Sequence, residues 1–230
     1  MFDIPIEEVT KPIRQKGKVA TLALGYGGGV NALIAMGALK MGLTEEELPS
    51  IVRLWRDSNP NIVNLWSRVE DAAKTTIETK TGRRINRTGL SMFYEKGTLF
   101  VKLPSGRFLS YYNARLYDDG QIVYEGVNSV NAWGDIGTWG GKLVENIVQA
   151  IARDCLSLAV TTCHDHGLKV VFHVHDEIII EVRSSQADKY LEKLKHYMTI
   201  NKEPWQDDNT QGDALYLPAA GYTCPYYMKD

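Results

Sequence analysis

The chain has 230 residues, of which 44% are hydrophobic and 23% are charged, and its formal net charge at pH 7 is −2. This composition is typical of a globular protein and excludes a disordered chain and a uniformly basic nucleic-acid coat. No apolar run approaches the roughly 20 residues that span a bilayer, and the acidic start MFDIPIEE has no apolar signal core. Three widely spaced cysteines do not suggest a disulfide framework, so we expect a cytoplasmic protein that binds no membrane.

The first third of the chain predicts helices. A segment that follows Lys11-Pro12 carries four residues spaced by four, which places them along one face of a helix: Arg14, Lys18, Leu22 and Tyr26. The glycine run 27–29 is expected to end this helix. Three more helices are predicted over 30–40, over 45–56 behind a Thr44–Glu47 capping box, and over 61–78.

The pattern changes after residue 90. Short β-branched and aromatic segments, separated by turn residues, predict a small antiparallel element over 90–126. Residues 127–140 are rich in Gly, Asn and Trp and are expected to form a loop. A long helix over 143–167, a hairpin over 169–182 and a helix over 186–200 complete an α+β chain. We expect two regions, 1–125 and 126–230.

The predicted hairpin carries His175, Asp176 and Glu177 between two nearly continuous apolar strands, so at least one of its faces should be buried. An aspartate in a tight turn has a simple structural explanation, because its side chain bonds the neighbouring backbone. Adjacent carboxylates are also the hard oxygen ligands that magnesium prefers. Both interpretations are open for the residues alone.

The basic face of the first predicted helix also has two interpretations. Arg14 and Lys18, one helical turn apart, can bind a phosphate chain, with Arg bidentate and Lys as a point charge. They can equally form a solvated helix start beside a core aromatic. The glycine run is not a Walker-type loop, because no Gly-Lys-Ser/Thr follows it.

Together, three segments resemble family A DNA polymerases of phage type. RQKGKVATLALGYGGG (14–29) is similar to motif B, the fingers helix of the form Arg-x3-Lys-x3-aromatic-x3-Tyr-Gly. VHDE (174–177) is similar to motif C, and ENIVQAIARDCL (145–156) to the helix before it, which touches the primer–template minor groove. The resemblance implies a helical fingers region followed by part of a palm with an antiparallel hairpin packed on helices.

For the nucleotide site, the resemblance implies roles on the first helix. Arg14 and Lys18 would bind the triphosphate of the incoming deoxynucleoside triphosphate, Tyr26 would guard the pocket of the templating base, and Gly27 would let the template bend. Leu22 stands beside the sugar, where the family usually has an aromatic residue. Sugar discrimination therefore does not follow from the resemblance.

For the catalytic centre, the resemblance implies that Asp176 binds the catalytic Mg²⁺ ions, with Glu177 as a nearby metal ligand and His175 close to the primer terminus. Glu145 or Gln149 would face the primer–template DNA.

Motif A of the family is a strand with an Asp in a context like Asp-Tyr-Ser-x-x-Glu, and it precedes motif B. No such segment precedes Arg14, and Asp3 is a poor substitute. Because a two-metal site needs carboxylates from separate strands, we expect an N-terminal polymerase half to supply motif A as a partner. The chain alone is then expected to be inactive.

Two other functions fit parts of the sequence. CHDHG (163–167) and HVHDE (173–177) together suggest a metal-dependent hydrolase, for which zinc is the natural metal. A non-catalytic module that binds nucleic acid or a partner is the other alternative. Its surface would carry Trp133, Trp139 and Trp205, although core packing is the commoner role of tryptophan.

Overall fold

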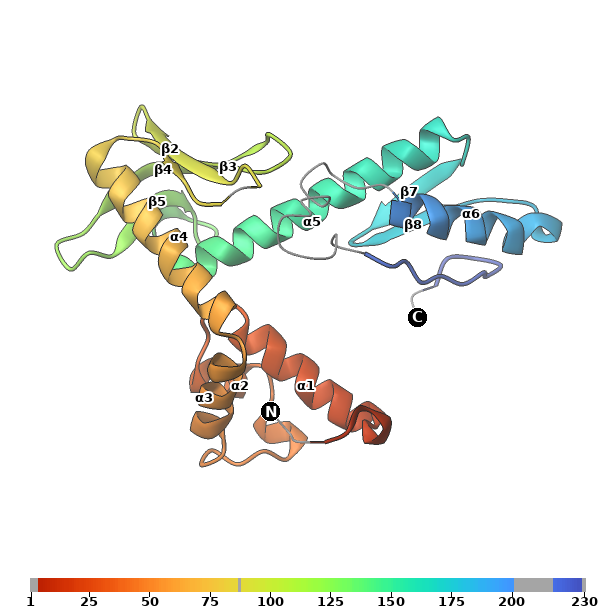
Figure 1. Cartoon of the computed structure of the whole chain (residues 1–230), viewed down its shortest axis with the longest axis horizontal. Helices are drawn as coiled ribbons and strands as arrows, with labels where there is room; N and C mark the ends of the chain where they lie inside the picture. Colours follow the sequence, from red (N-terminus) through yellow and green to blue (C-terminus); the bar gives the residue numbers. More distant parts are fainter. Residues whose placement is uncertain (1–3, 87, 201–216, 229–230) are drawn as a thin grey trace. The chain divides into compact units, whose positions relative to one another are not determined.

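The protein is described from a computed structural model, which covers residues 4–86, 88–200 and 217–228 (Figure 1). The chain forms two compact units. The first comprises Met1–Lys102 and Phe108–Val148, and the second comprises Leu103–Arg107 and Gln149–Asp230. Both helices and antiparallel strands are present, which confirms the predicted α+β class. The functional division at residue 125 stays a prediction.

The first unit begins with four α-helices: α1 (Lys11–Leu24), α2 (Val30–Ala35), α3 (Leu48–Ser58) and α4 (Pro60–Thr79). Short 3-10 turns precede α1, as η1 (Ile6–Glu8), and follow α2, as η2 (Leu39–Met41). The first three helices contact one another, and each contributes a fully buried leucine to their shared core: Leu24, Leu33 and Leu48. The lower part of Figure 1 shows these helices in red and orange.

The second and third helices begin or end differently from the prediction. The second helix ends at Ala35 rather than near residue 40, because Gly37 turns the backbone through the left-handed region at φ 87°. The capping box forms, since Glu47 Oε2 accepts a hydrogen bond of 2.8 Å from the Thr44 amide. Residues 45–47 nevertheless form a turn, and α3 begins at Leu48, because Pro49 has no N–H for an α-helical bond to Glu45.

A six-stranded antiparallel sheet follows α4, with the strands in sequence order: β1 (Arg83–Arg84), β2 (Ser91–Glu95), β3 (Thr98–Lys102), β4 (Phe108–Leu116), β5 (Ile122–Val127) and β6 (Trp133–Thr138). The predicted small β element is therefore larger than expected. The expectation of a loop over 127–140 was wrong, because β6 pairs with β5 along its whole length. Its glycines lower strand propensity, but the ladder to β5 satisfies its backbone.

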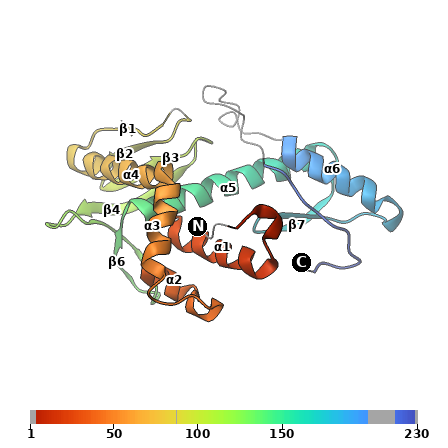
Figure 2. The ribbon, with the colours of Figure 1, turned by 60° about the horizontal axis from the view of Figure 1, so that its bottom comes forward.

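Helix α4 lies across one face of this sheet, as Figure 2 shows, and contacts β2, β3 and β4. The inward side chains of the strands alternate with outward ones, as expected for a sheet with one covered face. The buried residues at this interface come from both elements: Val69, Ala73, Thr76 and Ile77 of α4, and Met92, Leu99, Val101 and Tyr111 of the strands.

Helix α5 (Gly140–Asp165) begins in the first unit and ends in the second. As predicted, Gly167 closes it, and the Leu168 amide bonds back to the Cys163 carbonyl at 2.9 Å. Among the residues that the structure describes, no helix combines the length and apolar character that a bilayer crossing requires.

The second unit contains the hairpin of β7 (Val170–Val174) and β8 (Glu177–Ile180), the turn η3 (Ser184–Gln186) and α6 (Ala187–Ile200). One face of the hairpin packs on α5 and α6 in a core formed by Leu156, Ala159, Cys163, Leu168, Ile178 and Leu194. This confirms the predicted hairpin packed on helices. Its other face exposes Val171 and Phe172.

An ion pair between a buried carboxylate and a half-exposed arginine holds the β3–β4 turn in the second unit. The Asp154 carboxylate of α5 accepts hydrogen bonds from the Ser105 hydroxyl at 2.6 Å and from Arg107 Nε at 2.5 Å. Asp154 is buried. Removal of either donor would leave that charge under-satisfied, so the turn is bound firmly to the helix.

Candidate active site

Arg14, Lys18 and Leu22 lie on the exposed face of α1, while Val19, Ala20, Ala23 and Leu24 are buried on its other side. Within the described part of the chain, neither Arg14 nor Lys18 forms an ion pair. Leu22 is 49% exposed although it is apolar. The face predicted from the spacing of these residues therefore presents two charges and one apolar side chain to solvent.

Tyr26 is not on this helix face, contrary to the prediction, because α1 ends at Leu24 and Tyr26 lies in the turn that follows. The Gly25 amide still bonds to the Thr21 carbonyl at 2.8 Å, which completes the last helical turn. Gly27 then takes a φ of 84° and directs the chain away from the helix axis.

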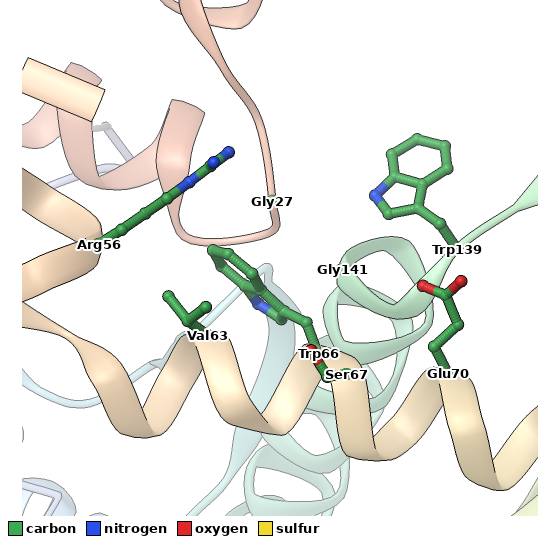
Figure 3. A pocket seen from close by; sticks show the side chains of 8 residues that line it. All are labelled: Gly27, Arg56, Val63, Trp66, Ser67, Glu70, Trp139 and Gly141. Carbon is green, nitrogen blue, oxygen red and sulfur yellow. The ribbon is translucent and has the colours of Figure 1, made fainter. Parts of the chain in front are cut away.

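A pocket of about 260 Å³ lies beside this turn, as Figure 3 shows. Residues from α4, α5 and the turn line it, with Arg56 of α3 at one side: Gly27, Arg56, Val63, Trp66, Ser67, Glu70, Trp139 and Gly141. Trp66 Nε1 donates to the Gly25 carbonyl at 3.2 Å, and Arg56 Nη2 donates to the Gly28 carbonyl at 3.1 Å. These side chains fix the backbone of the glycine turn that follows α1.

Close backbone approach explains the glycine pair that begins α5. A Cβ on Gly140 would lie 2.1 Å from the Trp66 carbonyl oxygen, and one on Gly141 would lie 2.1 Å from that of Tyr26. No other residue fits either position without displacing the backbone. This pocket was not predicted from the sequence. The Gly140-Gly141 pair directly before a strong helix pattern is the feature that could have indicated it.

Glu70 connects α4 to the first turn of α5. Its Oε2 accepts a hydrogen bond from the Gly140 amide at 2.8 Å, and its Oε1 pairs with Lys74 at 2.8 Å. Partial burial acts to raise the pKa of Glu70, but the bonds from Lys74 and the Gly140 amide outweigh it and lower this pKa. A negative charge therefore sits at the positive end of the α5 dipole.

The hairpin turn of the second unit consists of His175 and Asp176, between the paired residues Val174 and Glu177. His175 has a φ of 52°, a conformation that side-chain-bearing residues adopt at a cost. Asp176 is exposed, and its carboxylate forms no side-chain hydrogen bond among the described residues. Asp176 therefore does not stabilise its own turn through a side-chain hydrogen bond, which was the simpler interpretation of an aspartate at this position.

Glu177 is half-buried, and its Oε2 accepts a hydrogen bond of 3.1 Å from the Tyr227 hydroxyl. Tyr227 also packs edge-on against Phe172 of β7, with ring centroids 5.1 Å apart. Partial burial, together with the neighbouring Glu177 carboxylate, raises the pKa of the Tyr227 hydroxyl. The C-terminal segment thus orients the second carboxylate of the hairpin tip.

Asp176 and Glu177 fit a magnesium ion in donor type, since both are carboxylates and one has no hydrogen-bonding partner among the described residues. Across the described ranges, no three His, Cys, Asp or Glu side chains gather closely enough to hold a metal. His164 and His166 are exposed, and His166 packs against Tyr197. The cluster that the hydrolase alternative requires is therefore not assembled in this part of the chain.

The remaining predicted residues are on α5 or among the tryptophans. Glu145 pairs with Lys142 at 2.8 Å, and Gln149 is exposed. Trp133 and Trp139 are 63% and 51% exposed, so neither has the core role expected for tryptophan. Asp3 and Trp205 lie outside the described residues.

The structure thus brings the candidate residues together in two sets. Arg14, Lys18, Leu22, Tyr26 and Gly27 belong to the first unit, and His175, Asp176 and Glu177 belong to the second. The first unit combines an exposed basic helix with an antiparallel sheet, and the second carries carboxylates at a hairpin turn. This mixed α+β structure is consistent with a fingers and palm fragment of a polymerase.

Comparison with known proteins agrees with this class. Over its whole length the chain is 45% identical to a DNA polymerase of Bacillus phage SP02. The chain spans 35% of that polymerase's length. No family model matches the chain.

Proposed function

We propose that the chain forms the fingers and the second half of the palm of a family A DNA-directed DNA polymerase. The observation that carries the proposal is the exposed Asp176 carboxylate at the hairpin turn, in a chain similar throughout to a phage DNA polymerase. Its substrates are primer–template DNA and deoxynucleoside triphosphates, and it acts in the cytoplasm of a bacterial or phage-infected cell.

The reaction is in-line attack of the primer 3′-hydroxyl on the α-phosphate, with release of pyrophosphate. Arg14 and Lys18 bind the triphosphate from the exposed face of α1, Arg through two hydrogen bonds and Lys as a point charge. Tyr26 and Gly27 form the turn past which the template runs, and Glu145 or Gln149 contacts the primer–template.

Asp176 and Glu177 would hold Mg²⁺, and Tyr227 keeps Glu177 in position through its hydroxyl. When bound, a magnesium pair activates the hydroxyl nucleophile and stabilises charge on the leaving oxygens. His175 lies next to Asp176 in the turn, where it contacts the primer terminus. The residue types at the turn fit oxygen coordination rather than zinc chemistry.

A second carboxylate strand is required, because two divalent ions need more negative charge than one hairpin tip supplies. We propose that an N-terminal polymerase half carries it, as motif A. One observation supports this: the chain spans 35% of the length of the similar phage polymerase. The 230 residues alone are then inactive in polymerisation.

Substitution of one carboxylate tests the proposal. In the polymerase assembled with motif A, Asp176→Asn should lower the rate of primer extension by at least about a thousandfold, as expected for loss of a metal ligand in two-metal chemistry. Affinity for primer–template DNA should stay within about twofold.

Asp118→Asn is the matched control, since Asp118 is also an exposed aspartate in a hairpin turn. It should extend primers at the rate of the unchanged protein. Equal rates for Asp176→Asn and Asp118→Asn would refute the assignment of Asp176.

A further inference from the structure

The face of the six-stranded sheet opposite α4 carries a cluster of three phenylalanines. Phe93 and Phe100 pair across β2 and β3 and stack with centroids 4.9 Å apart. Phe108 of β4 meets both rings edge-on, at 5.6 and 6.3 Å. Phe108 is 48% exposed, so its ring is open to solvent. Aromatic side chains on an exposed sheet face are unusual unless something covers or uses them.

Cations flank this cluster. Lys102 of β3 pairs with Phe108 on one side and Ser91 on the other, and Ser91 pairs with Arg84 of β1. Cross-strand partners share a face, so one row of the sheet reads Arg84, Ser91, Lys102 and Phe108. Lys102 is exposed and forms no ion pair within the described part of the chain.

The adjacent row reads Phe93, Phe100 and Ser110, and neither row contains an acidic residue. The local charge on this part of the sheet is therefore positive, although the whole chain has a net charge of −2. The two rows together present two hydroxyls, two cations and three aromatic rings. This chemistry matches a strand of phosphates and bases better than an apolar protein surface.

The aromatic series continues along β4 to the last strand of the sheet. Tyr112, two residues beyond Ser110, is 55% exposed, and its ring lies 6.2 Å from that of Trp133, which is 63% exposed. Trp133 Nε1 donates to Glu125 at 3.3 Å, which fixes the indole. Glu125 and its cross-strand partner Asp135 share the cation Arg115, which pairs with Glu125 at 3.8 Å and more closely with Asp135. This end of the sheet therefore carries two carboxylates and one cation, and the positive charge is confined to the row of Lys102 and Arg84.

We propose that this aromatic face, defined as Arg84, Phe93, Phe100, Lys102, Phe108, Tyr112 and Trp133, binds single-stranded DNA. Bases stack on Phe108, Tyr112 and Trp133, and phosphates lie against Lys102 and Arg84. A duplex cannot use the rings in this way, because its base faces are stacked within the helix. The proposal extends the proposed function, since a polymerase meets unpaired template, but the binding itself requires no catalysis.

Fluorescence anisotropy of a labelled oligothymidine with the 230-residue chain tests this site. Phe108→Ala should weaken binding about tenfold, whereas Phe108→Tyr, which keeps the ring, should bind as the unchanged chain does. Lys102→Gln should weaken binding and reduce the slope of log affinity against log salt by about 0.7. Lys189→Gln, which removes an exposed cation from α6, is the charge control and should change little.

Equal affinity of Phe108→Ala and Phe108→Tyr, or of Lys102→Gln and Lys189→Gln, would overturn the proposal. So would a self-association of the chain that Phe108→Ala abolishes while oligothymidine affinity is unchanged, because the face would then be an interface between copies. Asp176→Asn should leave oligothymidine affinity intact. Failure of this site is thereby distinguishable from failure of the polymerase assignment.

Discussion

At the scale of single residues, the hairpin turn combines exposure with backbone strain. Asp176 is exposed without a hydrogen-bonding partner among the described residues, and its neighbour His175 adopts a left-handed conformation at φ 52°. Such conformations persist where the surrounding structure imposes them, often at functional sites. Here the two paired strands impose a two-residue turn, and the turn presents the carboxylate.

Substitutions of His175 test the cost of its left-handed backbone conformation. His175→Gly should raise the free energy of unfolding by up to about 1 kcal/mol, because glycine carries no left-handed penalty. His175→Val should lower it by about 1–2 kcal/mol, since a β-branched side chain fits that region poorly. Urea denaturation of the chain measures both.

His173→Val is the control, because His173 lies in the extended strand β7. An equal change in the free energy of unfolding for His175→Val and His173→Val would contradict backbone strain at His175. If His175 contacts the primer terminus, His175→Gly should also slow primer extension by the assembled polymerase despite its greater stability.

At the scale of elements, side-chain hydrogen bonds join the first turns of α5 to α4 and β4. Glu70 of α4 binds the Gly140 amide, and Asn146 Nδ2 of α5 donates to the Tyr111 hydroxyl of β4 at 3.0 Å. Burial, the largest effect, and the nearby Tyr124 raise the pKa of Tyr111 to about 12, although the bond from Asn146 opposes them. The free energy of unfolding should therefore depend on pH through both Glu70 and Tyr111.

Glu70→Gln should lower the free energy of unfolding at pH 7 by about 0.5–1 kcal/mol, because a charge at the helix N-terminus is lost. The pKa of Glu70 is lowered in the folded state, so its contribution is present above the unfolded pKa and disappears as pH falls through the folded pKa. Chemical denaturation should thus show a difference at pH 7 that shrinks as pH falls through the folded pKa. A difference that grows as pH falls would contradict this.

Tyr111 should affect the free energy of unfolding at alkaline pH. Because its pKa is raised in the folded state, its contribution is intact below the unfolded pKa of about 10 and declines as pH rises toward the folded value. The free energy of unfolding should then fall by about 1 kcal/mol per pH unit above pH 10. Tyr111→Phe should lose this component of the decline, and identical pH profiles for the two proteins would refute the cause.

The sequence predicted the elements whose pattern is local. The α5 helix, the β7–β8 hairpin and α6 all have strong periodicity and turn residues, and all three are present. It did not predict β6, because the glycines of this strand lower its local strand propensity and only the pairing with β5 stabilises it. It also missed the pocket beside Gly27, because Arg56, Trp66 and Glu70 meet the glycine turn only after the helices pack.

At the scale of the whole molecule, the two sets of candidate residues lie in different compact units. The first unit carries the exposed basic face of α1, and the second carries the carboxylates of the hairpin turn. The assignment of these two sets to motifs B and C, and the roles of their residues, stay proposals. The supply of a second carboxylate strand by an N-terminal polymerase half is likewise a proposal.

The most direct measurement is primer extension by the 230-residue chain, alone and after addition of an N-terminal polymerase polypeptide that carries motif A. We expect no extension by either polypeptide alone and magnesium-dependent extension by the mixture. Robust extension by the chain alone would contradict the account.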